Sequence, residues 1–249
     1  MLLEAREVTK AFGGFRAVDR ASLQIGRGEI IGLIGPNGAG KSTFFNCLTG
    51  DVRPTIGSVC LNGRDVTNLA PEARAALGLA RTFQVPQTFE GLTVLENVMI
   101  GAFLRTANPA EARRKASAVI VRTGLEDHAG SLANSLGTPG RKRLEMARAL
   151  ATEPEILLLD EAMAGLTAAE VRRAVELVRG IHASGVTLVI VEHIMEVIVS
   201  LAQKVIVFHQ GREIARGTPE EVTKDPAVIT AYLGKRRSSK PSTAAGKLQ

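Results

Sequence analysis

The sequence has few aromatic residues, few cysteines and no long hydrophobic run. Its 249 residues include no Trp, one Tyr and eight Phe. Proteins that bind single-stranded nucleic acid stack bases on aromatic side chains, so this scarcity gives no support to a nucleic-acid partner. No apolar run approaches the roughly 18 residues of a membrane-spanning helix, and the first ten residues, MLLEAREVTK, do not have the pattern of a signal peptide.

The two cysteines, Cys47 and Cys60, lie in or beside predicted core elements without the spacing of a metal site. We therefore interpret them as small apolar side chains in a reducing cytoplasm. What the chain has in quantity is apolar residues, which make up 45% of it and are enough for a sizeable core.

The net charge of +6 is concentrated at the end of the sequence. Residues 235–249 contain five Lys or Arg and no Asp or Glu, which leaves 26 basic and 25 acidic residues in the first 234. The body of the chain is therefore nearly neutral, and we expect 235–249 to be a basic disordered tail, rich in Ser, Pro and Ala. Such a tail could contact lipid headgroups; the alternative is a solvated end without function.

The strongest motif is the nonapeptide GPNGAGKST. It follows an apolar run at 29–34 and leads into a helix-forming segment at 44–48, the strand–loop–helix setting of a phosphate-binding P-loop. Glycines let the loop turn successive N–H groups toward an anion, and the helix start adds its positive dipole end. Lys41 is expected to reach the β- and γ-phosphates of a nucleoside triphosphate, and Ser42 to ligate Mg²⁺. The predicted nucleotide-binding residues of the loop are Gly35, Pro36, Asn37, Gly38, Ala39, Gly40, Lys41, Ser42 and Thr43.

The remaining apolar patterns predict an α/β fold around this loop. Residues 156–159 and 186–191 are short apolar strands separated by a helix at 167–183, an alternation typical of a parallel sheet. Residues 2–9 and 21–25 alternate as strands of an antiparallel sheet. We therefore predict a mixed or parallel sheet with helices, joined by an antiparallel β subdomain.

The pattern from about residue 92 to residue 150 is helical. Asn108 is the predicted N-cap of one helix, and Thr138 the predicted N-cap of another, followed by proline in the first turn. We predict a single domain at 1–234 in which the helical subdomain, about 92–150, is inserted in the core.

A carboxylate pair follows the apolar strand at 156–159. Asp160 would lie at the carboxyl edge of the sheet, where it can hold Mg²⁺ through water. Glu161, next to it, can polarise the attacking water as a general base or water-positioning group. The pair predicts hydrolysis of the bound triphosphate.

Two further polar residues are placed to join this site. His193 follows the strand at 186–191 and so lies beside the neighbouring strand ends, where it can donate to a γ-phosphate oxygen or to the lytic water. Gln84 can likewise ligate Mg²⁺ or the water. The predicted catalytic residues are thus Lys41, Gln84, Glu161 and His193, and the predicted metal ligands are Ser42, Gln84 and Asp160.

Taken in order, GPNGAGKST, Gln84, ILLLDE and His193 resemble the ATP-binding subunits of ABC transporters over about residues 2–234. Further motifs look like the branched-chain amino acid importer group: Phe12-Gly13-Gly14, Arg81-Thr82-Phe83-Gln84, Thr93-Val94-Leu95-Glu96-Asn97-Val98, RLEMARAL at 143–150, Ala164-Gly165-Leu166 and Val191-Glu192-His193. The resemblance implies a P-loop ABC ATPase core that uses ATP and Mg²⁺. It also implies that Phe12 stacks on adenine, with Phe15 as the other candidate, that Thr43 contacts phosphate, and that Gln84 couples the site to membrane subunits.

Two departures from the family's motifs concern the surface offered to a second ATPase subunit. Where the family has LSGGQ, this chain has Leu-Gly-Thr-Pro-Gly at 136–140, and Pro139 removes one N–H donor. Gly137, Thr138 and Gly140 remain the candidates for contact with a partner's nucleotide. Thr167 stands at the D-loop aspartate position, and Ala162 at that of the proline after the catalytic glutamate. We therefore predict an unequal pair with a second, different ATP-binding subunit; a homodimer is the alternative.

The resemblance implies a subunit that energises an ABC importer of branched-chain amino acids or a related small polar solute. Its expected partners are transmembrane permease subunits and, indirectly, a periplasmic solute-binding protein, and its expected place is peripheral, at the cytoplasmic face of the inner membrane.

A lipopolysaccharide-type exporter ATPase and a soluble non-transport ABC ATPase are the alternatives; the latter usually carries tandem domains, coiled-coil insertions or basic grooves, which this sequence lacks. A P-loop kinase or GTPase is a third class, which we exclude because its mechanism does not require the combination of Gln84, residues 136–150 and His193. The sequence does not identify the solute.

Overall fold

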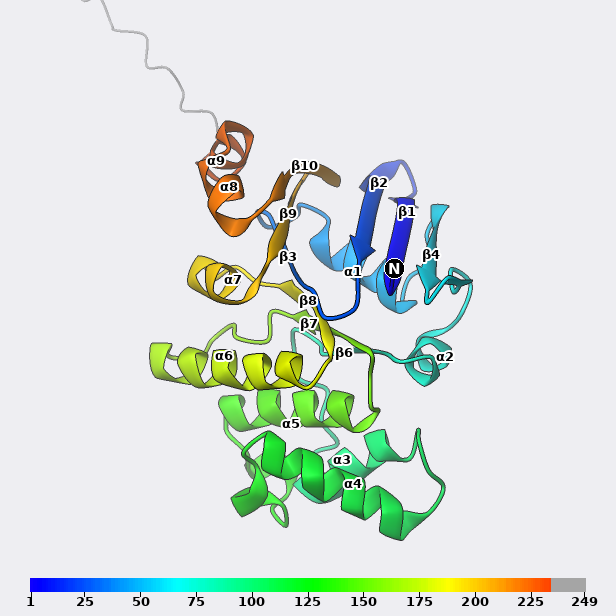
Figure 1. Ribbon diagram of the computed structural model, residues 1–249, viewed down its shortest axis with the longest axis vertical. Helices are drawn as coiled ribbons and strands as arrows, with labels where there is room; N and C mark the ends of the chain where they lie inside the picture. Colours follow the sequence, from blue (N-terminus) through cyan, green and yellow to red (C-terminus); the bar gives the residue numbers. More distant parts are fainter. Residues whose placement is uncertain (234–249) are drawn as a thin grey trace, which may run out of the picture.

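The computed structural model describes residues 1–233, which form two β-sheets with helices packed around them (Figure 1). The predicted basic tail at 235–249 lies outside the described residues. Within the described part of the chain, no helix is long and apolar enough to cross a membrane.

The larger sheet has six strands in the order β10-β9-β3-β8-β7-β6, and all neighbours are parallel except β9 and β10, which form an antiparallel hairpin. Its short apolar strands are buried on both faces, as expected for a parallel sheet covered by helices. The predicted mixed α/β sheet is confirmed. The strands are β3 (Ile30–Ile34), β6 (Leu79–Arg81), β7 (Ile156–Asp160), β8 (Thr187–Val191), β9 (Lys204–His209) and β10 (Arg212–Gly217).

The smaller sheet is antiparallel, in the order β2-β1-β4-β5. Helix α1 (Lys41–Thr49) packs its buried aromatic residues, Phe44 and Phe45, in a core shared by the two sheets. The predicted antiparallel subdomain is confirmed, and its strands run longer than the sequence pattern suggested. They are β1 (Leu3–Phe12), β2 (Phe15–Ile25), β4 (Ile56–Leu61) and β5 (Arg64–Asp65).

The opposite face of the larger sheet is covered by helices. Leu157 and Leu159 of β7 face this second core, whereas Ile156 and Leu158 face α1, as the alternation of side chains along a strand requires. Figure 1 shows α3, α4 and α5 grouped at the end of the molecule away from the smaller sheet. The helices that follow α1 are α2 (Pro71–Ala76), α3 (Val94–Ala102), α4 (Pro109–Arg122), α5 (Thr138–Ala151), α6 (Ala168–Ala183), α7 (Met195–Leu201), α8 (Pro219–Lys224) and α9 (Pro226–Leu233).

The helix starts agree with the sequence in one case and differ in another. The Asn108 side chain accepts hydrogen bonds from Ala110 N and Glu111 N, so its prediction as the N-cap of α4 is confirmed. The prediction for Thr138 is wrong, because Gly137 is the N-cap of α5 and Thr138 is already its first helical residue. Proline is favoured in the first turn at either position, so Pro139 alone did not determine which residue precedes the helix.

A buried arginine ties α2 to the end of α1. Arg74 is fully buried, and its guanidinium donates to the carbonyls of Cys47 at 2.9 Å and Leu48 at 2.7 Å. It also donates to Leu69 O and to Thr67 O, both at 3.0 Å. These carbonyls would otherwise lie in the interior without donors, and burial lowers the pKa of the arginine itself.

Replacing Arg74 by methionine is expected to destabilise the protein by about 3–5 kcal/mol, because it leaves several buried carbonyls without a donor. Denaturant unfolding followed by circular dichroism measures the change. The matched control is Arg27→Met, which removes an exposed ion pair to Glu155 and should change stability by no more than about 0.5 kcal/mol. Equal effects in the two variants would contradict this role for Arg74.

Candidate functional site

The site is built where four neighbouring parallel strands end. The P-loop follows β3, Gln84 follows β6, Asp160 ends β7 with Glu161 directly after it, and His193 follows β8. Since the carboxyl ends of parallel strands meet at one edge of a sheet, segments far apart in sequence come together there.

Two glycines of the P-loop are required by their backbone conformation and by their close neighbours. Gly35 has φ 150°, and a Cβ on it would lie 2.2 Å from the carbonyl oxygen of Phe208. Gly40 has φ 98°, and a Cβ there would lie 2.3 Å from the carbonyl oxygen of Ala17. The loop therefore packs against β9 on one side and β2 on the other, with no room for side chains at these positions.

Lys41 is buried and folded back over the loop. Its Nζ donates to the carbonyls of Gly35 at 2.7 Å and Pro36 at 3.1 Å, and burial lowers its pKa. The amine thus lies inside the curve of the loop, at the positive end of α1. Its expected role in binding phosphates stays a prediction.

A hollow of about 790 Å³ opens over the loop. Residues 37–43 line it, together with Phe15, Ala17, Gln84, Glu161 and His193. The predicted catalytic residues Lys41, Gln84, Glu161 and His193 therefore face one space. Gly35, Pro36 and Asp160 are adjacent to it in the chain but are not among its lining residues.

Glu161 is the centre of a polar cluster. Gln84 Nε2 donates to Glu161 Oε2 at 2.6 Å, and His193 Nε2 lies 2.5 Å from Glu161 Oε1. The backbone of Glu161 is in the left-handed region, with φ 48°, which is costly for a residue with a Cβ. The Glu161 carboxylate, on a strained backbone and between two polar side chains beside the P-loop, is suited to hold and polarise a water molecule.

Two charged residues with no sequence-based prediction keep this turn in place. Lys142 of α5 donates from Nζ to the backbone carbonyl of Glu161 at 3.0 Å. Glu192, buried beside His193, accepts from the backbone N–H of Met163 at 2.8 Å. Burial lowers the pKa of Lys142 and raises that of Glu192. Of these two residues, only Glu192 had a pattern in the sequence that could have indicated a role in the site, because its carboxylate comes directly after an apolar strand.

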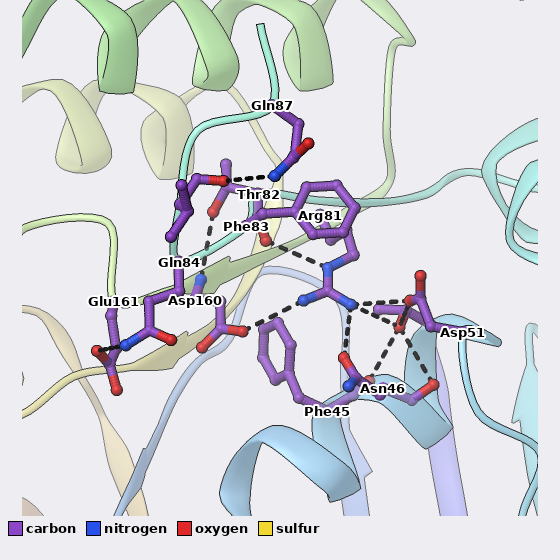
Figure 2. A network of polar contacts seen from close by, with 12 residues as sticks. Phe45, Asn46, Asp51, Arg81, Thr82, Phe83, Gln84, Gln87, Asp160 and Glu161 are labelled. Carbon is purple, nitrogen blue, oxygen red and sulfur yellow. Dashed lines mark hydrogen bonds and ion pairs between the residues drawn. The ribbon is translucent and has the colours of Figure 1, made fainter. Parts of the chain in front are cut away.

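Asp160 lies deeper than Glu161 and is paired with Arg81 (Figure 2). Arg81 Nη2 is 3.2 Å from Asp160 Oδ2. Burial raises the pKa of Asp160, while the positive charge of Arg81 acts in the opposite direction. The pairing with Arg81 was not predicted from the sequence.

The three predicted metal ligands share one donor chemistry. Ser42 offers a hydroxyl, Gln84 an amide oxygen and Asp160 a carboxylate, all hard oxygen donors of the kind that Mg²⁺ prefers. Among residues 1–233 no group of three or more His, Cys, Asp and Glu side chains could hold a metal ion by itself. The donors therefore fit an ion that takes its other ligands from phosphate oxygens and water.

The adenine-stacking residue expected from the resemblance differs from the aromatic ring that the structure brings to the hollow. Phe15 lines the hollow, whereas Phe12 does not and lies 5.0 Å from Lys10 Nζ. The reason is the strand order: β2, which carries Phe15 and Ala17, packs against the P-loop, and β1 lies one strand farther away. Phe15, the second candidate, is therefore the ring that faces the hollow, and which of the two rings stacks on adenine stays a prediction.

Phe15→Ala is expected to weaken binding of an ATP analogue about threefold to tenfold, since a stacked ring contributes on the order of 1 kcal/mol. Phe12→Ala, a matched loss of an exposed ring on the neighbouring strand, should leave the affinity nearly unchanged. Titration with a fluorescent analogue measures both. A larger loss in Phe12→Ala would assign adenine stacking to Phe12.

The three signature residues lie apart from this hollow. Gly137, Thr138 and Gly140 are at the start of α5, and none of them lines the space over the P-loop. Their expected contact is with the nucleotide of a partner subunit, so that assignment remains a prediction.

A second hollow, the α1–α5 groove, has a volume of about 530 Å³ and mixed walls. Its apolar part includes Phe83, Ile100 and Leu104, each partly exposed. Its polar part includes Asp51, Arg81 and Arg148. Phe83 directly precedes Gln84, so this groove and the hollow over the P-loop meet at one loop of the chain.

Comparison with known proteins agrees with these features. A family model described as "ABC transporter" matches residues 18–164, and one described as "Branched-chain amino acid ATP-binding cassette transporter" matches residues 212–237. The high-affinity branched-chain amino acid transport ATP-binding protein LivG of Escherichia coli (strain K12) is 38% identical over 249 residues, covering 94% of this chain and 98% of that protein. The lipopolysaccharide export system ATP-binding protein LptB of Acidithiobacillus ferridurans is 33% identical, covering 94% and 97%.

Solved structures match along nearly the whole chain. A nucleotide-free ATP-binding cassette from an ABC transporter superposes with a TM-score of 0.86 at 30% identity, covering 94% of this chain and 99% of that one. An ATP-binding cassette in its ADP conformation gives a TM-score of 0.85 at 30% identity, with the same coverage.

Proposed function

This chain belongs to the ATP-binding proteins of ABC transporters, within the branched-chain amino acid group, and we propose that it drives uptake of branched-chain amino acids or a related small polar solute. The ATPase activity that would drive this uptake is supported by one observation: Lys41 of the P-loop shares a hollow with Glu161, Gln84 and His193. An anion cradle beside a strained carboxylate is what hydrolysis of a bound triphosphate requires.

The residues divide into binding and chemical roles. The backbone of the P-loop and Lys41 hold the phosphates of ATP, and Thr43 adds a hydroxyl. Ser42, Gln84 and Asp160 would hold Mg²⁺, which would supply charge neutralisation for the transferred phosphoryl group. Glu161 takes the proton of the attacking water, and His193, in contact with Glu161, donates to the γ-phosphate.

The second ATP-binding subunit of the transporter is proposed to be a different chain. The residues at the start of α5 support this, because Pro139 cannot donate from its backbone and Gly137 carries no hydroxyl. In such a pair, this chain would contribute a complete set of catalytic residues, including Glu161, to one ATP site. To the other ATP site it would contribute only the weakened signature segment at 136–140.

The pairing can be tested with the isolated full-length chain. With Glu161→Gln to prevent turnover, we expect it to remain monomeric in gel filtration at saturating MgATP. The combined change Gly137→Ser and Pro139→Gly should favour an ATP-dependent dimer, because it restores a hydroxyl and an N–H donor. A tight ATP-loaded homodimer of the unmodified signature would contradict the unequal pair.

The α1–α5 groove is proposed to receive a segment of the permease. It has exposed apolar side chains next to paired charges, and its Phe83 directly precedes Gln84 of the nucleotide hollow. Binding there would hold the protein as a peripheral subunit at the cytoplasmic face of the inner membrane.

The transport role is tested by co-purification of the tagged chain with its membrane partners and by the ligand of the accompanying periplasmic binding protein. Recovery of a polytopic permease together with an amino-acid-binding protein is expected. Recovery of lipopolysaccharide-export components would favour the LptB-like alternative, for which the 33% identity is the supporting observation.

A further inference from the structure

Arg81, the last residue of β6, connects α1 to the carboxylate of Asp160 (Figure 2). Its Nη1 donates to Asn46 Oδ1 at 2.7 Å and to Asp51 Oδ2 at 2.8 Å. Its Nη2 donates to Asp160 Oδ2 at 3.2 Å. One guanidinium therefore serves two carboxylates, one at the α1–α5 groove and one at the proposed metal site.

Aromatic rings hold this guanidinium in a poorly solvated place. Its central carbon lies 4.3 Å from the ring centroid of Phe83 and 5.5 Å from that of Phe45. The Arg81 side chain is 11% exposed and that of Asp160 is 7% exposed. Charges interact strongly in such surroundings because water does not screen them.

Arg81 is the charge in direct contact with Asp160, and Lys41 acts on the same carboxylate more weakly and without an ion pair. Among the ion pairs of residues 1–233, Arg81 is the one cationic partner of Asp160, and the same arginine also pairs with Asp51. Asp51 is the more exposed carboxylate, at 29%, and it lines the groove, whereas Asp160 lines neither hollow. Arg81 contacts both carboxylates at once, Asp51 through Nη1 and Asp160 through Nη2, so the two share one positive charge.

We propose that Arg81 is a positioning residue, the counter-cation that competes with Mg²⁺ for the Asp160 carboxylate, and that Asp51 sets how firmly Arg81 is held there. The inference rests on the proposed role of Asp160 as a metal ligand. A carboxylate paired with a guanidinium accepts a second cation less readily, because the two positive charges repel each other. Asp51 shares the guanidinium and so weakens this competition.

The test uses the full-length chain and a fluorescent, non-hydrolysable ATP analogue. Its affinity is measured in EDTA and over a range of Mg²⁺ concentrations, which gives the Mg²⁺ midpoint at which tight binding appears. Arg81→Met should lower that midpoint about tenfold, and Asp51→Asn should raise it about threefold, since the two changes act oppositely on the charge at Asp160. In the double variant the midpoint should equal that of Arg81→Met, because Asp51 acts through Arg81.

A matched control separates this effect from loss of an arginine in the groove. Arg148 lines the same groove and lies over Phe89, without contact to Asp160, so Arg148→Met should leave the midpoint unchanged. Should Arg81→Met fail to fold by circular dichroism, Arg81→Lys, which keeps the charge, should stay near the wild-type midpoint, and Asp51→Asn then decides.

The outcomes distinguish the inference from the function it rests on. If the wild-type chain binds the analogue equally with and without Mg²⁺, the proposed metal site is wrong, and the inference falls with it. If the wild type depends on Mg²⁺ but Arg81→Met raises the midpoint, or Asp51→Asn leaves it unchanged or lowers it, Arg81 only holds the structure and the inference alone is wrong.

Discussion

Glu161→Gln is expected to lower ATP turnover by about 10²–10⁴-fold, because it removes the group proposed to accept the proton of the attacking water. The amide has the size of the carboxylate, whose oxygens lie 2.6 Å from Gln84 Nε2 and 2.5 Å from His193 Nε2. It can therefore still contact both side chains. ATP binding should therefore persist. Turnover is measured in the assembled transporter, and binding with a fluorescent ATP analogue.

Glu196→Gln is the matched control for this substitution. It makes the same change of charge three residues beyond His193, on an exposed part of α7 that does not line the hollow. Its turnover should be close to that of the wild type. Undiminished turnover in Glu161→Gln would assign the proton transfer to another group.

Lys41→Met is expected to weaken ATP binding by about 10–100-fold, since hydrogen bonds from a charged amine to phosphate are worth about 1.5–3 kcal/mol. Methionine fits the buried position without a charge. It leaves the carbonyls of Gly35 and Pro36 without the lysine as a donor. Equilibrium titration of the isolated chain gives the affinity, and thermal unfolding without nucleotide shows that the variant is folded.

The control for charge is Lys204→Met. Lys204 begins β9, at the edge of the sheet opposite the P-loop, and pairs with Glu29 on the surface. ATP affinity should be unaffected there. If the two lysine variants bind ATP equally well, phosphate recognition depends on the loop backbone alone, and the assigned role of Lys41 is wrong.

The local sequence was sufficient to predict the segments whose functional residues are adjacent in the chain. The P-loop, the Asp160-Glu161 pair and His193 each follow a short apolar strand, and a parallel sheet brings the ends of such strands to one edge. Knowing which strands are parallel was therefore enough to predict that Lys41, Glu161 and His193 meet. The N-cap at Asn108 was equally local, because a cap bonds only to the next turn of its own helix.

The sequence alone did not determine which side chains from distant segments complete the site. The motif favoured Phe12 over Phe15 as the stacking ring, whereas the order of strands places β2, with Phe15, against the P-loop.

Lys142 and Arg74 have the pattern of ordinary helix surface residues, yet both point their charge at backbone carbonyls of other segments. Such contacts depend on packing between elements far apart in the chain, and this packing cannot be predicted from the local periodicity of the sequence.

The P-loop, the carboxylate pair and the sheet were thus determined by the sequence itself, through short-range pattern and the geometry of parallel strands. The tertiary structure decided which aromatic ring lines the hollow, the support of Glu161 by Lys142 and the sharing of Arg81 between Asp51 and Asp160. The physical reason is that a buried charge takes whatever partner the packing brings within reach, because leaving it unpaired costs more than any local preference.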